Sequence, residues 1–142
     1  MPKADPFLKW AGGKRKLLGA ILGAAPTSFK RYLEPFFGGG AVALALGYQP
    51  MLLNDSNDEL MNTYCVVRDA LDALLPLFDE HQRMHSEAYF YAVRAQAPST
   101  LGPCKRAARF IYLNKTCFNG LYRVNKRGEF NVPFGRYTNP IL

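Results

Sequence analysis

Residues 34–40, Glu-Pro-Phe-Phe-Gly-Gly-Gly, are the stretch of this 142-residue chain whose residue types and spacing best fit a chemical role. An apolar run precedes them and a small-residue segment, 41–46, follows. Glycines let backbone approach a ligand closely, and the N-terminus of a helix starting at residue 41 favours negative charge. Asp55 follows a second apolar run, 51–53, and a carboxylate there can accept hydrogen bonds from both hydroxyls of a ribose. The pattern predicts a nucleoside pocket.

The glycines alone do not identify the nucleoside. The Gly-x-Gly-x-x-Gly spacing of nicotinamide pockets is not met, because position 43 is Ala43, and a loop that merely closes over a sheet stays an alternative. The glycine pair in residues 10–14 does not fit a phosphate loop, because Arg15 follows Lys14 and position 8 is Leu8. We therefore favour a methyl-donor pocket, keep a nucleotide-dependent oxidoreductase as an alternative, and do not favour nucleoside triphosphate hydrolysis.

The formal charge of +7 lies entirely in residues 105–142, where eight basic side chains accompany Glu129 as the single acid. Residues 1–104 contain equal numbers of basic and acidic side chains. Aromatic side chains and asparagines are interleaved with the C-terminal cations. Because cations bind phosphates, rings stack on bases and amides reach base edges, this segment predicts a DNA-binding surface. A solvated basic face on a helix over 104–115 is the alternative.

The remaining composition sets limits on the class of protein. The length predicts one domain, or one domain with an insertion. No apolar run reaches the roughly 18 to 20 residues of a membrane span and no signal peptide is evident, so we expect a soluble, cytoplasmic protein with no membrane partner. Cys65, Cys104 and Cys117 are too widely spaced to predict disulfides or zinc. His81 and His85 are four residues apart without a third ligand, so we expect solvated histidines and no metal.

Local patterns predict an α/β chain with strands near Tyr32 and over 51–53. Helices are expected over 15–22, 41–46, 70–84, 86–97 and 104–115, with Pro76 kinking or breaking its helix. Ser56 and Glu59 read as a capping box that opens one more helix, whose inward face would hold Leu60, Tyr64 and Val67.

The C-terminal part predicts one amphipathic helix and one basic β-hairpin. On the helix over 104–115 the expected inward residues are Ala108, Ile111 and Tyr112, and the expected outward residues are Lys105, Arg106 and Arg109. Residues 121–124, 125–128 and 129–132 read as strand, turn and strand.

Four stretches taken together resemble the Dam family of DNA adenine methyltransferases: residues 7–14, 34–40, 54–57 and the region from 119 to 137. They follow the family's order and spacing over nearly the whole chain. The resemblance implies a Rossmann-like core that binds S-adenosylmethionine, incomplete here, with a helical and β-hairpin DNA-recognition insertion. It implies a cofactor-binding part over 1–56, a target-recognition part over 57–142, double-stranded DNA with GATC sites as partner, and a bacterial or phage source.

The resemblance also carries over site residues by position. The positions implied to bind the cofactor are Trp10, Ala11, Lys14, Glu34, Phe36, Gly38, Gly40 and Asp55. The positions implied to read or flank the target bases are Lys9, Phe118, Asn119, Leu121, Arg123, Pro133 and Tyr137. Arg123 suits a bidentate contact with guanine. The implied phosphate contacts are Lys115, Asn125, Asn131 and Arg136.

The family's Asp-Pro-Pro-Tyr motif, which follows the recognition insertion, is not found in residues 1–142. In the family this motif orients the exocyclic amine of a flipped adenine for attack on the methyl group. We therefore name no catalytic residue here, expect a truncated methyltransferase, and expect the 142-residue chain alone to be inactive. A non-catalytic DNA-binding module or decoy is the alternative. An incomplete sheet also leaves strand edges that can pair with a second copy.

Overall fold

The computed structural model describes residues 4–47 and 50–142, and the chain divides into two compact units, Met1–Ser56 and Asn57–Leu142. This division concerns packing alone. A cofactor-binding role for the first unit and a recognition role for the second stay predictions. Within the described ranges, none of the helices combines the length and the apolar character that crossing a membrane requires.

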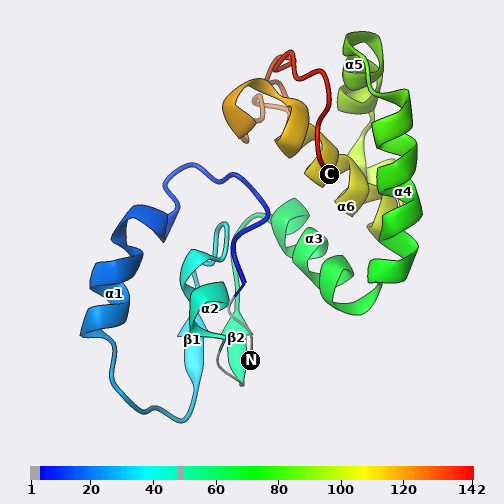
Figure 1. Cartoon of the computed structure of the whole chain (residues 1–142). Coiled ribbons are helices and arrows are strands. Elements are labelled where there is room, and N and C mark those ends of the chain that lie inside the picture. The colour runs from blue at the N-terminus through cyan, green and yellow to red at the C-terminus, as the bar shows by residue number, and fades with distance from the viewer. Residues whose placement is uncertain (1–3, 48–49) are drawn as a thin grey trace. The chain divides into compact units, whose positions relative to one another are not determined.

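The first unit is a small α/β arrangement around two parallel strands. A 3₁₀ helix, Lys14–Leu17, leads into α1 (Leu18–Ala24), and β1 (Tyr32–Glu34), α2 (Ala41–Leu46) and β2 (Met51–Leu53) follow (Figure 1). The strands pair in register from Tyr32 opposite Met51 to Glu34 opposite Leu53. A parallel pair needs a crossover between its strands, and α2 lies in that connection. The strand positions and the helix over 41–46 agree with the sequence predictions.

The apolar run before residue 34 suits a buried strand, but β1 is largely open to solvent. Leu33 is 55% exposed and its partner in register, Leu52, is 65% exposed, so both lie on an open face of the sheet. Glu34 is the buried residue of β1. Among the described residues the sheet contains only β1 and β2, and a two-stranded parallel sheet has too few neighbours to bury both faces.

The second unit is a helical cluster centred on α6 (Pro103–Thr116). The other helices are α3 (Asp58–Asp69), α4 (Leu71–Met84) and α5 (Glu87–Ala95), with a 3₁₀ turn at Pro98–Thr100. All three helices pack against α6 (Figure 1). One buried core cluster in this unit joins α5, α6 and the C-terminal segment, and it consists of Phe90, Val93, Tyr112, Leu113, Cys117 and Val132.

The start of α3 differs from the sequence prediction, and one of the two effects predicted for Pro76, a break, is not found. The cap of α3 is Asn57 and not Ser56, because the Asn57 side chain accepts a hydrogen bond from the Leu60 amide at 3.0 Å. The buried face of α3 consists of Leu60, Thr63 and Val66, with Tyr64 only half-buried. Pro76 does not break α4, which continues from Leu71 to Met84.

The predicted β-hairpin is a turn with little strand structure. Residues 121–132 form no ladder of strand residues and pair through one antiparallel bridge, Val124 with Phe130. The turn itself is present, because the Asn125 amide donates to the Glu129 carbonyl at 2.9 Å and the Gly128 amide donates to the Asn125 carbonyl at 3.0 Å. Val124 is exposed and Phe130 is only half-buried, so few apolar contacts extend the pairing.

Candidate cofactor pocket and nucleic-acid interface

The glycine loop of the first unit is fastened to the end of β2. The Gly38 amide donates to Oδ2 of Asp55 at 2.8 Å, and the Phe37 amide donates to the Asn54 carbonyl at 2.8 Å. The Asn54 amide in turn donates to the Glu34 carbonyl at 2.9 Å. The structure therefore brings together the loop and the acid that the sequence separates by fifteen residues.

The glycines of this loop make room for the protein's own aromatic rings. A Cβ atom at Gly38 would lie 3.0 Å from Cδ1 of Trp10, and one at Gly40 would lie 2.7 Å from Cζ of Phe37. Both glycines also have positive φ, +55° and +75°. The loop therefore needs glycine for its backbone conformation and for close packing of Trp10 and Phe37.

A second polar group surrounds the buried carboxylate of Glu34. Nζ of Lys14 lies 2.8 Å from Oε1, and the Tyr32 hydroxyl donates to Oε2 at 2.8 Å. Lys14 also donates to the carbonyl of Phe36, whose own ring is 79% exposed. Burial, together with the hydrogen bond and charge of Glu34, raises the pKa of Tyr32, which keeps that phenol a donor.

A cavity of about 560 Å³ adjoins this second group. Its walls come from α1, β1 and α2 and are mostly apolar, with Lys14, Glu34 and Phe36 among the lining residues. Trp10, Gly38 and Asp55 do not line it. The cofactor positions implied by the sequence thus form two groups within one unit, one around the cavity and one at the glycine loop, while Ala11 is exposed.

These side chains fit the chemistry of an amino-acid nucleoside. Asp55 and Glu34 supply acceptors for hydroxyls or an ammonium, Lys14 supplies a cation for a carboxylate, and the exposed ring of Phe36 offers a stacking face. The cavity volume lies in the range of small-molecule sites.

In the second unit, two chain segments from the sequence-predicted interface lie side by side. Cys117 and Phe134 form an antiparallel bridge, and the Phe118 amide donates to the Pro133 carbonyl at 2.9 Å. The implied DNA-contacting positions on these segments are exposed or half-buried; they are Phe118, Asn119, Pro133, Arg136 and Tyr137. Asn119 and Arg136 have positive φ, +54° and +58°, a conformation that side-chain-bearing residues rarely adopt.

The turn region holds the other implied contacts. Arg123 is exposed, and its Nε donates to Oδ1 of Asn131 at 2.7 Å. The Asn125 side chain closes the turn, because its Oδ1 accepts the amides of Arg127 and Glu129 and its Nδ2 donates to Glu129. Leu121 is exposed, Lys115 is half-buried, and Lys9 is exposed in the first unit.

Two basic residues of α6 are not on a solvated face, contrary to the sequence prediction. Arg109 is buried, and it donates to the carbonyls of Val93 at 3.0 Å and Arg94 at 2.8 Å. Both carbonyls lie in the last turn of α5, and the Val93 carbonyl also accepts from the Gln96 amide at 3.2 Å, so Arg109 helps to close the end of that helix. Burial lowers the pKa of Arg109.

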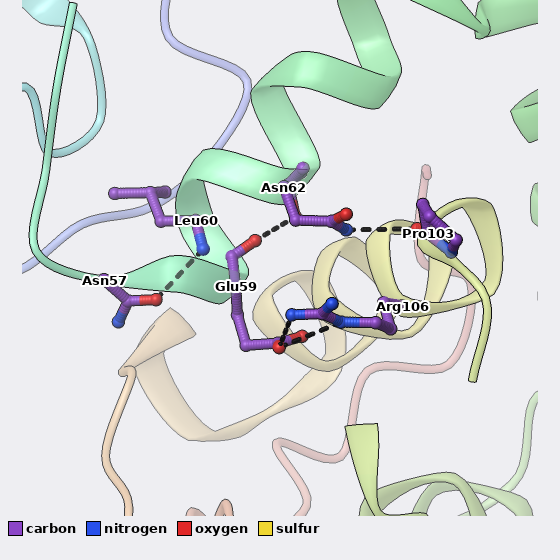
Figure 2. A network of polar contacts seen from close by, with 7 residues as sticks. Asn57, Glu59, Leu60, Asn62, Pro103 and Arg106 are labelled. Carbon is purple, nitrogen blue, oxygen red and sulfur yellow. Dashed lines mark hydrogen bonds and ion pairs between the residues drawn. The ribbon is translucent and has the colours of Figure 1, made fainter. Parts of the chain in front are cut away.

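Arg106 is the second inward-facing cation of α6. Its guanidinium pairs with Glu59 of α3, next to a hydrogen bond from Nδ2 of Asn62 to the Pro103 carbonyl (Figure 2). These contacts attach α6 to α3 and do not point to a ligand. Lys105 is exposed, as predicted.

The two histidines are not solvated, which corrects the sequence prediction. His81 shares a 2.9 Å hydrogen bond with the Tyr89 hydroxyl and stacks on the Tyr112 ring at 4.7 Å. His85 shares hydrogen bonds with the Tyr112 hydroxyl at 2.8 Å and the Tyr137 carbonyl at 2.7 Å. The partners lie eight to 52 residues away, so no local pattern could have predicted them.

Comparison with known proteins gives the family. The family model for D12 class N6 adenine-specific DNA methyltransferases matches residues 10–142. The type II methyltransferase M.MjaIII of Methanocaldococcus jannaschii is 45% identical, with 97% of this chain and 54% of the relative aligned. The DNA adenine methylase of Serratia marcescens is 41% identical, with 99% and 52% aligned. The DNA N-6-adenine-methyltransferase of Escherichia phage P1 is 43% identical, with 94% and 18% aligned. The chain thus spans about half the length of the first two relatives, and it belongs to the D12 class of N6 adenine-specific DNA methyltransferases.

Proposed function

We propose that this chain carries the donor-binding and target-recognition parts of an adenine-specific DNA methyltransferase that uses S-adenosylmethionine and acts on GATC. The observation that carries the proposal is the gathering of exposed, implied DNA contacts on segments 117–119 and 133–137, both within residues 105–142, which carry eight basic side chains and one acid. Named relatives that methylate DNA adenine support the reaction class.

The donor site that we propose combines the glycine loop with the cavity group. Asp55 would accept the ribose hydroxyls, Lys14 and Glu34 would engage the amino-acid part, and Phe36 and Trp10 would contact the rings. S-adenosylmethionine supplies the methyl group when bound. The role of these residues is to bind and orient it.

Asp55→Ala tests this site without requiring turnover. We expect weaker binding of S-adenosylmethionine by calorimetry and unchanged affinity for a GATC duplex, because Asp55 is not among the implied DNA contacts. Lys16→Ala, an exposed cation of the same unit outside the proposed site, is the matched control. An unchanged dissociation constant in Asp55→Ala would refute the placement of the ribose.

Target recognition is tested with Arg123→Ala. We expect a loss of about 1 to 3 kcal/mol in discrimination at one guanine, as for a bidentate contact. Affinity should be measured on GATC and scrambled duplexes at several salt concentrations. Equal weakening on both duplexes would assign Arg123 to phosphate, and equal wild-type affinity for both would refute GATC as the target.

We also propose that residues 1–142 alone do not turn over, because they contain no Asp-Pro-Pro-Tyr. Incubation with a GATC duplex and a labelled methyl donor should give no incorporation, and robust incorporation would refute this.

The unpaired edges of the β1–β2 sheet and its exposed leucines favour self-association. Sedimentation at several concentrations tests it, and a monomer at all of them would refute it. A DNA substrate would place the activity of this bacterial or phage-encoded protein in the cytoplasm.

A further inference from the structure

The segment 132–137, which we call the anchored loop, is held by the protein at nearly every second residue. The Val132 carbonyl accepts from Nη1 of Arg94 at 3.1 Å, and the Tyr137 carbonyl accepts from Nε2 of His85 at 2.7 Å. Between them, the Gly135 amide donates to the Thr116 carbonyl at 2.9 Å. Their partners are the C-cap residue of α4, a side chain of α5 and a carbonyl of α6.

Close packing fixes the loop further. A Cβ atom at Gly135 would lie 2.6 Å from the carbonyl oxygen of Cys117. The backbone of the loop therefore packs directly against the backbone at Cys117, without room for a side chain. Pro133 and Arg136 are exposed on the same loop, and Arg136 has a φ of +58°. An L residue in that conformation is strained by about 1 kcal/mol or more and persists only where the surroundings hold it.

His85 connects this strained end of the loop to the buried core. A carbonyl oxygen only accepts hydrogen bonds, so Nε2 of His85 carries the proton and donates it to Tyr137. In the neutral ring Nδ1 is then an acceptor, and the Tyr112 hydroxyl is its donor. Tyr112 is fully buried, and burial raises its pKa to about 12, so the phenol keeps its proton. The Tyr112–His85–Tyr137 chain thus runs from α6 to the loop backbone.

We propose that His85 is a positioning residue for target discrimination, which fixes the backbone at Tyr137 so that the exposed face of the anchored loop meets the base edges in one register. This rests on the proposed DNA-recognition function of the second unit. His85 touches no DNA in this scheme and acts through Tyr137. Cations elsewhere in the unit supply the sequence-independent affinity.

The test compares His85→Phe with His85→Gln and His81→Phe in the full 142-residue chain. Phenylalanine keeps a ring but removes both hydrogen bonds, whereas glutamine retains a donor for the Tyr137 carbonyl. His81→Phe is the matched control, because His81 lies one turn earlier on α4 and contacts the same Tyr112 ring without contacting the loop. Thermal unfolding of each variant measures the general cost in stability.

In His85→Phe we expect the preference for a GATC duplex over a scrambled duplex to fall by about tenfold, the size of a lost base contact. The affinity for the scrambled duplex and its salt dependence should stay unchanged, and both His85→Gln and His81→Phe should keep the preference. A preference retained in His85→Phe, or lost equally in His81→Phe, would overturn the proposal.

Trypsin cleavage after Arg136 gives a readout that needs no DNA. In His85→Phe we expect faster cleavage there relative to cleavage after Arg127, which lies in the turn away from the anchored loop. An unchanged ratio of the two cleavage rates would show that the hydrogen bond from His85 to Tyr137 does not hold the anchored loop in place. A wild-type chain without GATC preference would instead overturn the proposed function, and that result appears in the wild-type arm before any variant is compared.

Discussion

At the scale of single residues, Asn131 holds the guanidinium of Arg123 in the free protein. It accepts from Nε at 2.7 Å through its side chain and from Nη2 at 3.2 Å through its carbonyl. A guanidinium has five donor hydrogens, so those on Nη1 and the second on Nη2 stay available for the two acceptors of guanine. The contacts of Asn131 therefore orient the Arg123 guanidinium, which differs from the phosphate contact that the family resemblance implies for Asn131.

The first prediction concerns this pair. Asn131→Ala should reduce discrimination at the same guanine as Arg123→Ala, by about 1 kcal/mol, because Arg123 loses a partner that orders it. The double variant should be no worse than Arg123→Ala alone. The measurement is a double-mutant cycle of dissociation constants on GATC and on a duplex with that guanine replaced. Additive losses would show that Asn131 acts independently, as a phosphate contact would.

The second prediction concerns Arg109, whose burial separates it from the other cations of α6. Arg109→Met should destabilise the chain by about 1 to 3 kcal/mol, because the carbonyls of Val93 and Arg94 both lose the guanidinium as a donor and Val93 keeps only its bond from the Gln96 amide. The salt dependence of DNA binding should not change. Lys105→Ala is the control and should stay within about 0.5 kcal/mol of wild type in denaturant unfolding. A weaker salt dependence of DNA binding in Arg109→Met would show that Arg109 contacts DNA phosphates.

At the scale of elements, local sequence patterns predicted the helix and the strands of the first unit. The helix over 41–46 follows from small apolar residues after a glycine run, and the parallel strands follow from two apolar runs separated by that helix. The sequence could not predict which cations of α6 face inward, because Arg109 is paired with carbonyls of another helix. The bond between His85 and Tyr137 was unpredictable for the same reason, since tertiary packing selects it.

The third prediction compares two adjacent positions before α3. Asn57→Ala should cost about 0.5 to 2 kcal/mol, because the Leu60 amide loses its acceptor at the N-terminus of the helix. Ser56→Ala should be nearly neutral, although the sequence pattern favoured Ser56 as the cap. Free energies of unfolding from denaturant titrations measure both. A larger loss in Ser56→Ala would mean that the capping box forms in solution.

At the scale of the whole molecule, burial and pairing reduce the number of cations in residues 105–142 that can reach DNA. Arg109 is buried and Arg106 is paired with Glu59, so six of the eight cations in residues 105–142 can meet phosphates. With about 0.9 counterions released per phosphate contact, the logarithmic salt slope of this segment should not be steeper than about −5. Composition alone overstates the electrostatic part of binding, because it does not distinguish internal cations from surface ones.

The last prediction concerns how the stability of the fold depends on pH. Burial lowers the pKa of His81, and the charge of Glu80 opposes this effect only in part. The imidazole of the folded protein therefore binds a proton less tightly than that of the unfolded chain, where histidine titrates near 6.5. Stability from this group is therefore complete above about pH 7 and falls as the pH drops below about 6.5, by up to about 1.4 kcal/mol per pH unit. His81→Gln should flatten the dependence between about pH 5 and 7, a window above the titration of ordinary carboxyl groups. Denaturant unfolding of both proteins across this window measures it, and equal slopes would show that His81 titrates normally in the fold.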